Sequence, residues 1–243
     1  MASDAKILQY LDELENWVLD SECIVALIGI ARLERKLLAA RQYVRYTDVS
    51  KKKIWENWAW SDSQIEEWYK SDAYKKASKL IDNIKAKFNA TNTGYKLLVS
   101  KKVRTLEEQL YLWRISDQVL SLGIELKEKV SKEIDKSGYS ETAGKDDAEK
   151  FRKFLAKVSL KSKLMLAAPG LSDHGHGNAY DFVIEDKSGK RMASASGAWI
   201  STWDGPHGWT QKLKDAVNAA GEGRFKGPLA SPYEPWHYEY NYT

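Results

Sequence analysis

The sequence has little that would place it among disulfide-bonded or membrane-embedded proteins. Its 243 residues include one cysteine, Cys23, so no disulfide can form within the chain. The most apolar stretch, residues 23–33, is shorter than the ~20 residues of a membrane-spanning helix and predicts a buried helix instead. The first residues lack the basic and apolar regions of a secretory signal, so we expect synthesis in the cytoplasm without one.

The charge balance is mildly basic and excludes few partners by itself. The formal net charge is +4, which favours an anionic polymer as a partner. No compact basic stripe accompanies a nucleic-acid-binding motif, so we do not expect the chain to bind nucleic acid.

Two regions of the sequence differ in their patterning. Up to residue 92, apolar side chains recur at helical spacing, which predicts an all-α segment. Later, residues 95–100 and 178–185 have the pattern of strands, and residues 105–134 that of a long helix, broken near Gly123. The polar loop 89–94 is the expected boundary. We therefore predict an α+β protein: a helical domain at residues 1–92, then a domain at residues 93–243 with a small, mostly antiparallel sheet and flanking helices.

Four tryptophans crowd one part of the helical region, namely Trp55, Trp58, Trp60 and Trp68. Indole faces stack on sugars, so one interpretation is a glycan-binding surface. Tryptophan is also rich in packed cores and protein interfaces, and we favour that second interpretation.

A ten-residue motif near the end of the chain offers an imidazole and a carboxylate. Residues 172–181 match S-x-H-x-x-G-x-A-x-D at every specified position, with His174 and Asp181 as the groups that can bind a metal. Residues 178–185 alternate as a strand does, so Asp181 lies on the face opposite Tyr180 and Phe182.

A second motif, Glu-Pro-Trp-His at residues 234–237, offers another imidazole and a further carboxylate. A spacing of three would put Glu234 and His237 on opposite faces of a regular strand. Pro235 removes a backbone donor, so we expect a bend at residues 235–236 that brings both side chains to one place.

Together the motifs supply what a catalytic zinc site needs. Such a site has three protein ligands, an open position and a base beside the attacking water. His174, Asp181 and His237 are the candidate ligands of Zn²⁺, and Glu234 is the candidate base. The alternative for Glu234 is a carboxylate that orients His237.

Paired in this order, the motifs resemble those of the zinc D-Ala-D-Ala carboxypeptidase/dipeptidase and L-Ala-D-Glu endopeptidase family of peptidoglycan peptidases, over roughly residues 95–240. The resemblance implies a zinc peptidase that cleaves peptidoglycan stem peptides. It also implies that Arg104 polarises the scissile carbonyl, although the family usually has Gly-Tyr before this arginine and the present chain has Lys-Val. The alternative for Arg104 is a surface ion pair.

The same resemblance nominates three substrate-binding residues: Ser172, Gln109 and Trp236. Ser172 is equally well suited to forming a turn, and Gln109 to a helix surface.

The expected context is a phage lysin or a tail-associated wall hydrolase, which acts on the cell wall after release by lysis or as part of the virion. In the second case residues 1–92 would contact virion or tail proteins. Two alternatives remain open: a non-catalytic zinc-bearing virion protein that serves in structure or binding, and a cytosolic D-Ala-D-Ala dipeptidase.

Overall fold

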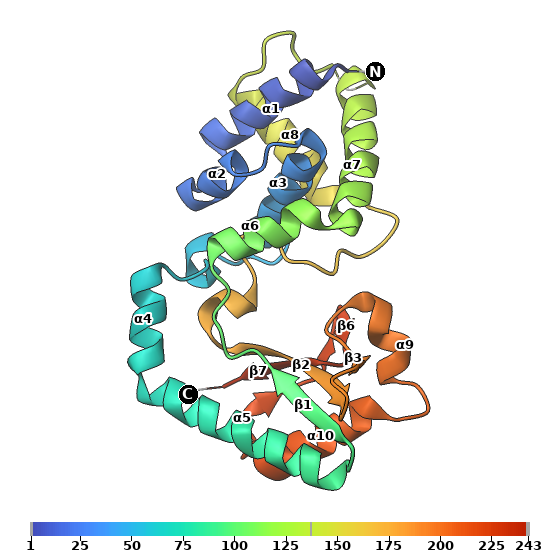
Figure 1. The fold of residues 1–243 in the computed structure, drawn as a ribbon. Coiled ribbons are helices and arrows are strands. Elements are labelled where there is room, and N and C mark those ends of the chain that lie inside the picture. Colours follow the sequence, from blue (N-terminus) through green and yellow to red (C-terminus); the bar gives the residue numbers. More distant parts are fainter. Residues whose placement is uncertain (1, 137, 242–243) are drawn as a thin grey trace. The chain divides into compact units, whose positions relative to one another are not determined.

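The structure is a computed structural model that describes residues 2–136 and 138–241. It confirms the predicted α+β class, because helices predominate and the strands form a small antiparallel sheet (Figure 1). The segment at the N-terminus is helical, as expected. Among the described helices, none combines the length and the apolar character needed to cross a membrane.

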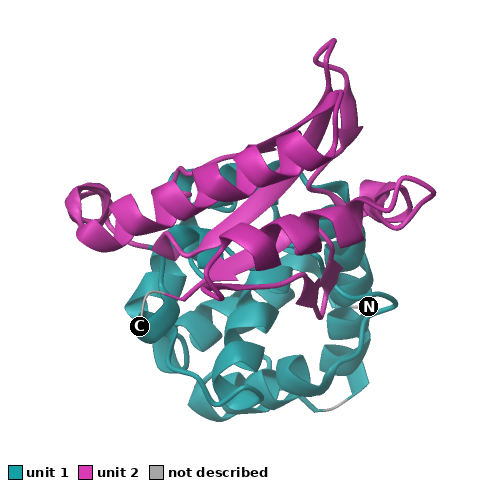
Figure 2. Ribbon diagram, turned by 90° about the horizontal axis from the view of Figure 1, so that it is seen from below, with its two compact units in different colours: residues 1–59, 105–175 teal, residues 60–104, 176–243 magenta. Residues whose placement is uncertain are grey.

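The chain divides into two compact units, each made of two segments (Figure 2). Unit 1 comprises residues 1–59 and 105–175, and unit 2 comprises residues 60–104 and 176–243. The sequence pattern indicates one boundary, after residue 92, so the compact units divide the chain differently. The assignment of residues 1–92 and 93–243 to two domains with separate roles stays a prediction.

The regular elements among the described residues of unit 1 are all helices. Its elements are α1 (Asp4–Trp17), α2 (Ser21–Ile28), α3 (Leu33–Asp48), η1 (Ile54–Asn57), α6 (Leu106–Ile115), α7 (Asp117–Lys136) and α8 (Lys145–Lys157). Each of these helices contributes buried apolar side chains to one core. The turn η2 (Asp173–His176) then carries the chain into the second segment of unit 2.

Helix α7 runs through Gly123 without a break, contrary to the prediction from the sequence. A Cβ atom at Gly123 would lie 2.4 Å from the carbonyl oxygen of Glu34, so glycine allows the main chain of α7 to approach α3 closely. The helix pattern is interrupted instead at Ser116, between α6 and α7. The Ser116 hydroxyl accepts from the backbone N–H of Val119 at 3.2 Å and so caps α7.

Arginines of α3 satisfy carbonyls at the ends of neighbouring helices. Arg35 is 7% exposed and donates to the carbonyls of Trp113 and Ser116 at 2.6 and 2.8 Å, at the end of α6. Arg41 donates to the carbonyl of Val158 at 2.7 Å, at the end of α8. The last carbonyls of a helix lack partners within the helix, so the cations stabilise the helix ends. The Ser116 carbonyl also accepts from the backbone N–H of Leu120 in α7, at 3.2 Å.

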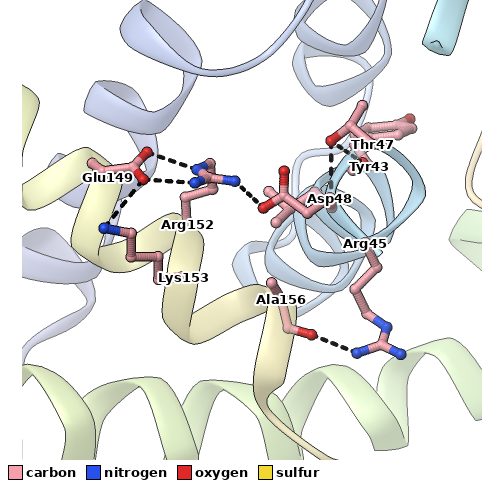
Figure 3. Close-up of polar contacts among 9 residues, drawn as sticks. Tyr43, Arg45, Thr47, Asp48, Glu149, Arg152, Lys153 and Ala156 are labelled. Carbon is pink, nitrogen blue, oxygen red and sulfur yellow. Dashed lines mark hydrogen bonds and ion pairs between the residues drawn. The ribbon is translucent and has the colours of Figure 1, made fainter. Parts of the chain in front are cut away.

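A polar network also ties α3 to α8 (Figure 3). Arg45 donates to the carbonyl of Ala156 at 2.5 Å. Arg152 on α8 pairs with Asp48 on α3 and binds both carboxylate oxygens of Glu149, at 2.6 and 2.7 Å. Arg152 therefore bridges one acidic residue of its own helix and one of α3.

Unit 2 combines helices with the strands. Its elements are α4 (Asp62–Lys70), α5 (Asp72–Thr91), β1 (Tyr95–Val99), β2 (Ala179–Asp186), β3 (Arg191–Ala193), η3 (Gly197–Trp199), α9 (Ile200–Trp203), α10 (Trp209–Ala220), β4 (Phe225–Lys226), β5 (Leu229–Ala230), β6 (Tyr233–Glu234) and β7 (His237–Tyr240). The main sheet has the order β1-β2-β7-β4, β3 also pairs with β2, and β5 and β6 form a separate hairpin. All of these pairings are antiparallel.

Helix α5 belongs to the core of unit 2. It contacts β1 and α10, and its buried side chains pack with those of the strands. The apolar residues that define this face are Leu80, Ile81, Ile84 and Phe88. The apolar face of the sheet needs a helical layer to cover it. Helix α5 provides this layer, so it packs with the strands that follow it, although the sequence pattern assigns it to the N-terminal domain.

Candidate metal centre

Two of the three predicted ligands are directly paired on adjacent strands. Asp181 on β2 is opposite His237 on β7 in the antiparallel register, so their side chains share one face of the sheet. The Asp181 Oδ1 and His237 Nδ1 atoms are 3.0 Å apart. Neighbouring Tyr180 and Phe182 point into the apolar core, as the strand alternation predicts.

The predicted bend between Glu234 and His237 is present. Strand β6 ends at Glu234, β7 begins at His237, and residues 235–236 form a turn between them. The backbone N–H of Phe182 donates to the carbonyl of Trp236 at 3.0 Å, which fixes this turn to β2. As a result, the Glu234 Oε2 atom lies 3.7 Å from His237 Nδ1.

The third predicted ligand joins the same cluster. His174 lies in the turn η2, and the ligand atoms of His174, Asp181 and His237 all lie within 4.8 Å of one another. Between His174 and Asp181, Gly177 adopts a φ of +67°, a backbone conformation that favours glycine. Its carbonyl accepts from the hydroxyl of Tyr180 at 2.8 Å, so the glycine turn is tied to β2.

The cluster fits a metal ion in both chemistry and spacing. Two imidazoles and a carboxylate are ligands that suit zinc, and they suit other divalent transition metals as well. Two ligand atoms about 2.1 Å from a tetrahedral ion lie roughly 3.3 Å apart, close to the 3.0 Å between Asp181 and His237. The three residues can therefore hold one metal ion.

Burial and charge shift the pKa values of two groups beside the cluster. Burial raises the pKa of Glu234; the charge of Asp181 also raises it, and His237 opposes the shift. Burial alone would lower the pKa of His237, but the hydrogen bond and charge of Asp181 outweigh it, so this pKa is raised. In the metal-free protein both groups therefore hold protons more tightly than usual, and a bound cation would compete with those protons.

Arg104 lies beside the predicted ligands. It follows β1 and the buried residue Val103, and its Nη2 atom is 3.8 Å from Asp181 Oδ2. Its side chain keeps 25% of its surface exposed, so the guanidinium is near the cluster and reachable from solvent. The predicted role for Arg104 in polarising a carbonyl stays a prediction.

The predicted substrate-binding residues are mostly buried. Gln109 Oε1 accepts from the backbone N–H groups of Gly170 and Ser172, at 2.9 and 3.4 Å, so Gln109 fixes the chain that leads to η2. Ser172 is itself buried, and Trp236 packs in the core of unit 2. These contacts give Gln109 and Trp236 a structural role, and substrate binding by any of the three residues stays a prediction.

Sequence reasoning did not connect α4 with the metal motif. Trp60 and Trp68 pack together within unit 2, with ring centroids 5.5 Å apart, and Trp60 lies edge-on to His176 at 6.0 Å. In unit 1, Trp58 packs against Tyr43, while Trp55 is exposed. The capping box at Ser61 predicts the start of α4, but only the tertiary contacts reveal which part of the chain its aromatic face covers.

Comparison with known proteins adds no relative. No protein-family model matches the chain, and no curated protein or solved structure matches it either. Any functional conclusion therefore rests on the two motifs and on the positions of their side chains.

Proposed function

We propose that the chain is a zinc-dependent peptidase that cleaves peptidoglycan stem peptides. The observation that carries the proposal is the convergence of His174, Asp181 and His237, with the Glu234 carboxylate 3.7 Å from His237 Nδ1. These four side chains come from two motifs more than fifty residues apart in the sequence, and the pairing of β2 with β7 places Asp181 opposite His237.

The residues around the cluster suit hydrolysis of an amide. When bound, the cation polarises the scissile carbonyl and makes water more acidic. Glu234 accepts the proton from the attacking water and passes it to the leaving amine, and a raised pKa helps a carboxylate to do both near neutral pH. Arg104 directs a permanent, forked positive charge to the oxygen that becomes negative as the carbonyl is attacked.

The substrate class and the biological context come from the resemblance of the two motifs. Peptidoglycan stem peptides are the expected substrates, and a phage lysin or a tail-associated wall hydrolase is the expected setting. The mildly basic net charge is compatible with an anionic cell wall.

Replacing the proposed base tests the proposal. Glu234→Gln should keep bound zinc and lose hydrolysis by a factor of ~10²–10⁴, because glutamine has nearly the same shape but cannot accept the proton. Zinc content and the release of stem-peptide fragments from purified peptidoglycan are measured in parallel. Glu185→Gln is the matched control, since this carboxylate lies on the same sheet and pairs with Arg191.

Two outcomes would contradict the proposal. Full zinc content with unchanged hydrolysis in Glu234→Gln would remove Glu234 from the mechanism. Inactivity of the unmutated, zinc-loaded protein on every wall type would favour the alternative of a non-catalytic zinc-bearing protein.

A further inference from the structure

Helix α4 contacts the metal motif through Trp68. A Cβ atom at Gly177 would lie 2.5 Å from Trp68 Nε1 and 2.7 Å from Trp68 Cε2, so the indole packs directly against the glycine main chain. Trp68 is 8% exposed and is held by Trp60 and Tyr74, with ring centroids 5.5 and 5.9 Å away. The glycine turn between His174 and Asp181 thus rests on a fixed aromatic surface.

The next residue of α4 contacts the segment that carries Arg104. The Tyr69 hydroxyl accepts from the backbone N–H of Val103 at 2.8 Å. The Val103 side chain is 1% exposed and packs in a small apolar cluster with Ile65 and Trp68. The position of Val103 is therefore fixed by both its main chain and its side chain, immediately before Arg104.

Burial argues against a sugar-binding role for Trp68. An aromatic side chain that stacks on a glycan must present one open ring face, and Trp68 presents almost none. Two neighbouring tyrosines, Tyr69 of α4 and Tyr74 of α5, are half-buried and lie edge-on to each other at 5.0 Å. The aromatic face of α4 is thus occupied by contacts within unit 2.

We propose that α4 is a positioning element of the metal site: Trp68 fixes the glycine turn between the ligands His174 and Asp181, and Tyr69 fixes the segment that carries Arg104. The part that concerns Trp68 depends only on metal binding by the cluster. The part that concerns Tyr69 and catalysis also rests on the proposed peptidase function. The two parts therefore have separate readouts.

The first test measures metal affinity directly. Trp68→Phe should weaken Zn²⁺ binding, measured by competition with a chelator, by at least ~10-fold, because loss of a side chain that supports a metal ligand commonly costs this much. The absorption bands of bound Co²⁺ should shift as well, since the ligand geometry loosens. Trp209→Phe is the matched control: it removes the same volume from the core of unit 2, beside Phe88 and Tyr95. It should lower the unfolding temperature and leave both metal readouts unchanged.

A double-mutant cycle tests the contact itself. Gly177→Ala alone should weaken Zn²⁺ binding, because the new methyl group meets the indole of Trp68 and strains the backbone. In the Trp68→Phe background the same substitution should cost at least ~3-fold less affinity, since part of the obstruction is gone. Strictly additive effects on Zn²⁺ affinity, or unchanged affinity in Trp68→Phe, would overturn the role of Trp68.

The second test concerns Tyr69. Tyr69→Phe leaves the Val103 N–H without its acceptor, so the NMR resonance of the Arg104 side-chain Nε–H should move while Zn²⁺ affinity stays within ~2-fold of wild type. If the unmutated protein hydrolyses stem peptides, kcat should fall by ~10-fold or more with KM little changed. Tyr74→Phe, which removes a hydroxyl from the same cluster, is the control and should do neither. An unmoved Arg104 resonance overturns the role of Tyr69 whether or not the protein is a peptidase.

Discussion

The buried arginines of unit 1 and the partly buried charged cluster of unit 2 have different kinds of partner. In unit 1, the guanidinium groups of Arg35 and Arg41 donate to backbone carbonyls at helix ends. In unit 2, charged side chains of both signs contact one another, and Asp181 is within 4 Å of both His237 and Arg104. The first arrangement leaves each buried cation satisfied by the main chain. The second leaves ionisable groups facing a common point.

This difference separates a structural use of charged residues from the functional use that we propose for the cluster. A cation that caps helix carbonyls is held by the main chain, and its loss would take a hydrogen-bond donor away from carbonyls in a dry environment. A cluster of two imidazoles and a carboxylate contributes little to the stability of the fold by itself, because its groups compete for protons and repel or attract one another in pairs. Such a cluster indicates a bound cation or a reaction.

The largest expected effect tests where unit 2 begins. A fragment of residues 93–243 lacks α5, whose four large buried side chains stabilise by about 1.5–3 kcal/mol each. Their sum, roughly 6–12 kcal/mol, is comparable with the ~5–15 kcal/mol stability of a whole domain. We therefore expect this fragment to lose its near-ultraviolet circular dichroism and its Zn²⁺ binding.

The matched control is the fragment of residues 60–243, which lacks the same part of unit 1 but keeps α4 and α5. It should retain Zn²⁺ binding. If the shorter fragment bound Zn²⁺ as tightly as the full chain does, α5 would be dispensable and the sequence boundary at residue 92 would describe the molecule better than the compact units do.

A smaller effect is expected in unit 1. Arg35→Met keeps much of the side-chain volume but removes the side-chain donor to the carbonyls of Trp113 and Ser116, of which Ser116 keeps the backbone N–H of Leu120. Unfolding in urea should show a loss of about 1–3 kcal/mol, and Zn²⁺ affinity should not change. Arg32→Met, at an exposed residue beside the same helix, is the control. A change in Zn²⁺ affinity in Arg35→Met would contradict a purely structural role for this buried cation.

The sequence alone was sufficient to predict the central pair of the candidate metal site and the local turns. Strand alternation placed Asp181 opposite the aromatic face, and the three-residue spacing of Glu234 and His237 required the bend that is observed. The S/T-x-x-E/Q patterns that start at Ser61 and Thr105 are capping-box signatures, and a helix begins directly after each of these residues. These features depend on neighbours within a few residues, so a local pattern is enough to reveal them.

What the sequence did not reveal depends on contacts between distant segments. Helical spacing shows that α5 has an apolar face, but not that the face covers a sheet. A glycine within a helix pattern suggests a break. The carbonyl of Glu34, which makes glycine necessary at position 123, is far away in the sequence, so the local pattern could not show this reason. For the same reason the contact of Trp68 with Gly177 left no signal beyond a local excess of aromatic residues.

The smallest expected effect concerns an exposed carboxylate of unit 1. Arg152 holds both oxygens of Glu149, and this hydrogen bonding lowers the pKa of Glu149 to about 2. Because the Glu149 side chain is 42% exposed, solvent screens most of the interaction, and Glu149→Gln should cost no more than ~0.5 kcal/mol at neutral pH. Asp48→Asn should cost more, since Asp48 is less exposed and its ion pair with Arg152 joins two helices.

The pH dependence of this small effect has a definite sign. A carboxylate whose pKa is lowered on folding stabilises the folded state above its ordinary value of 4.5, and that contribution is lost as the pH falls towards about 2. The difference in unfolding free energy between wild type and Glu149→Gln should therefore shrink as the pH falls from 4.5 to about 2. At neutral pH, added salt should reduce the same difference. Urea unfolding of both proteins at several pH values measures it. A loss of unfolding free energy above ~1.5 kcal/mol at neutral pH would mean that Glu149 behaves as a buried charge does. Solvent exposure would then not distinguish the charged groups of unit 1 that contribute strongly to stability from those that contribute weakly.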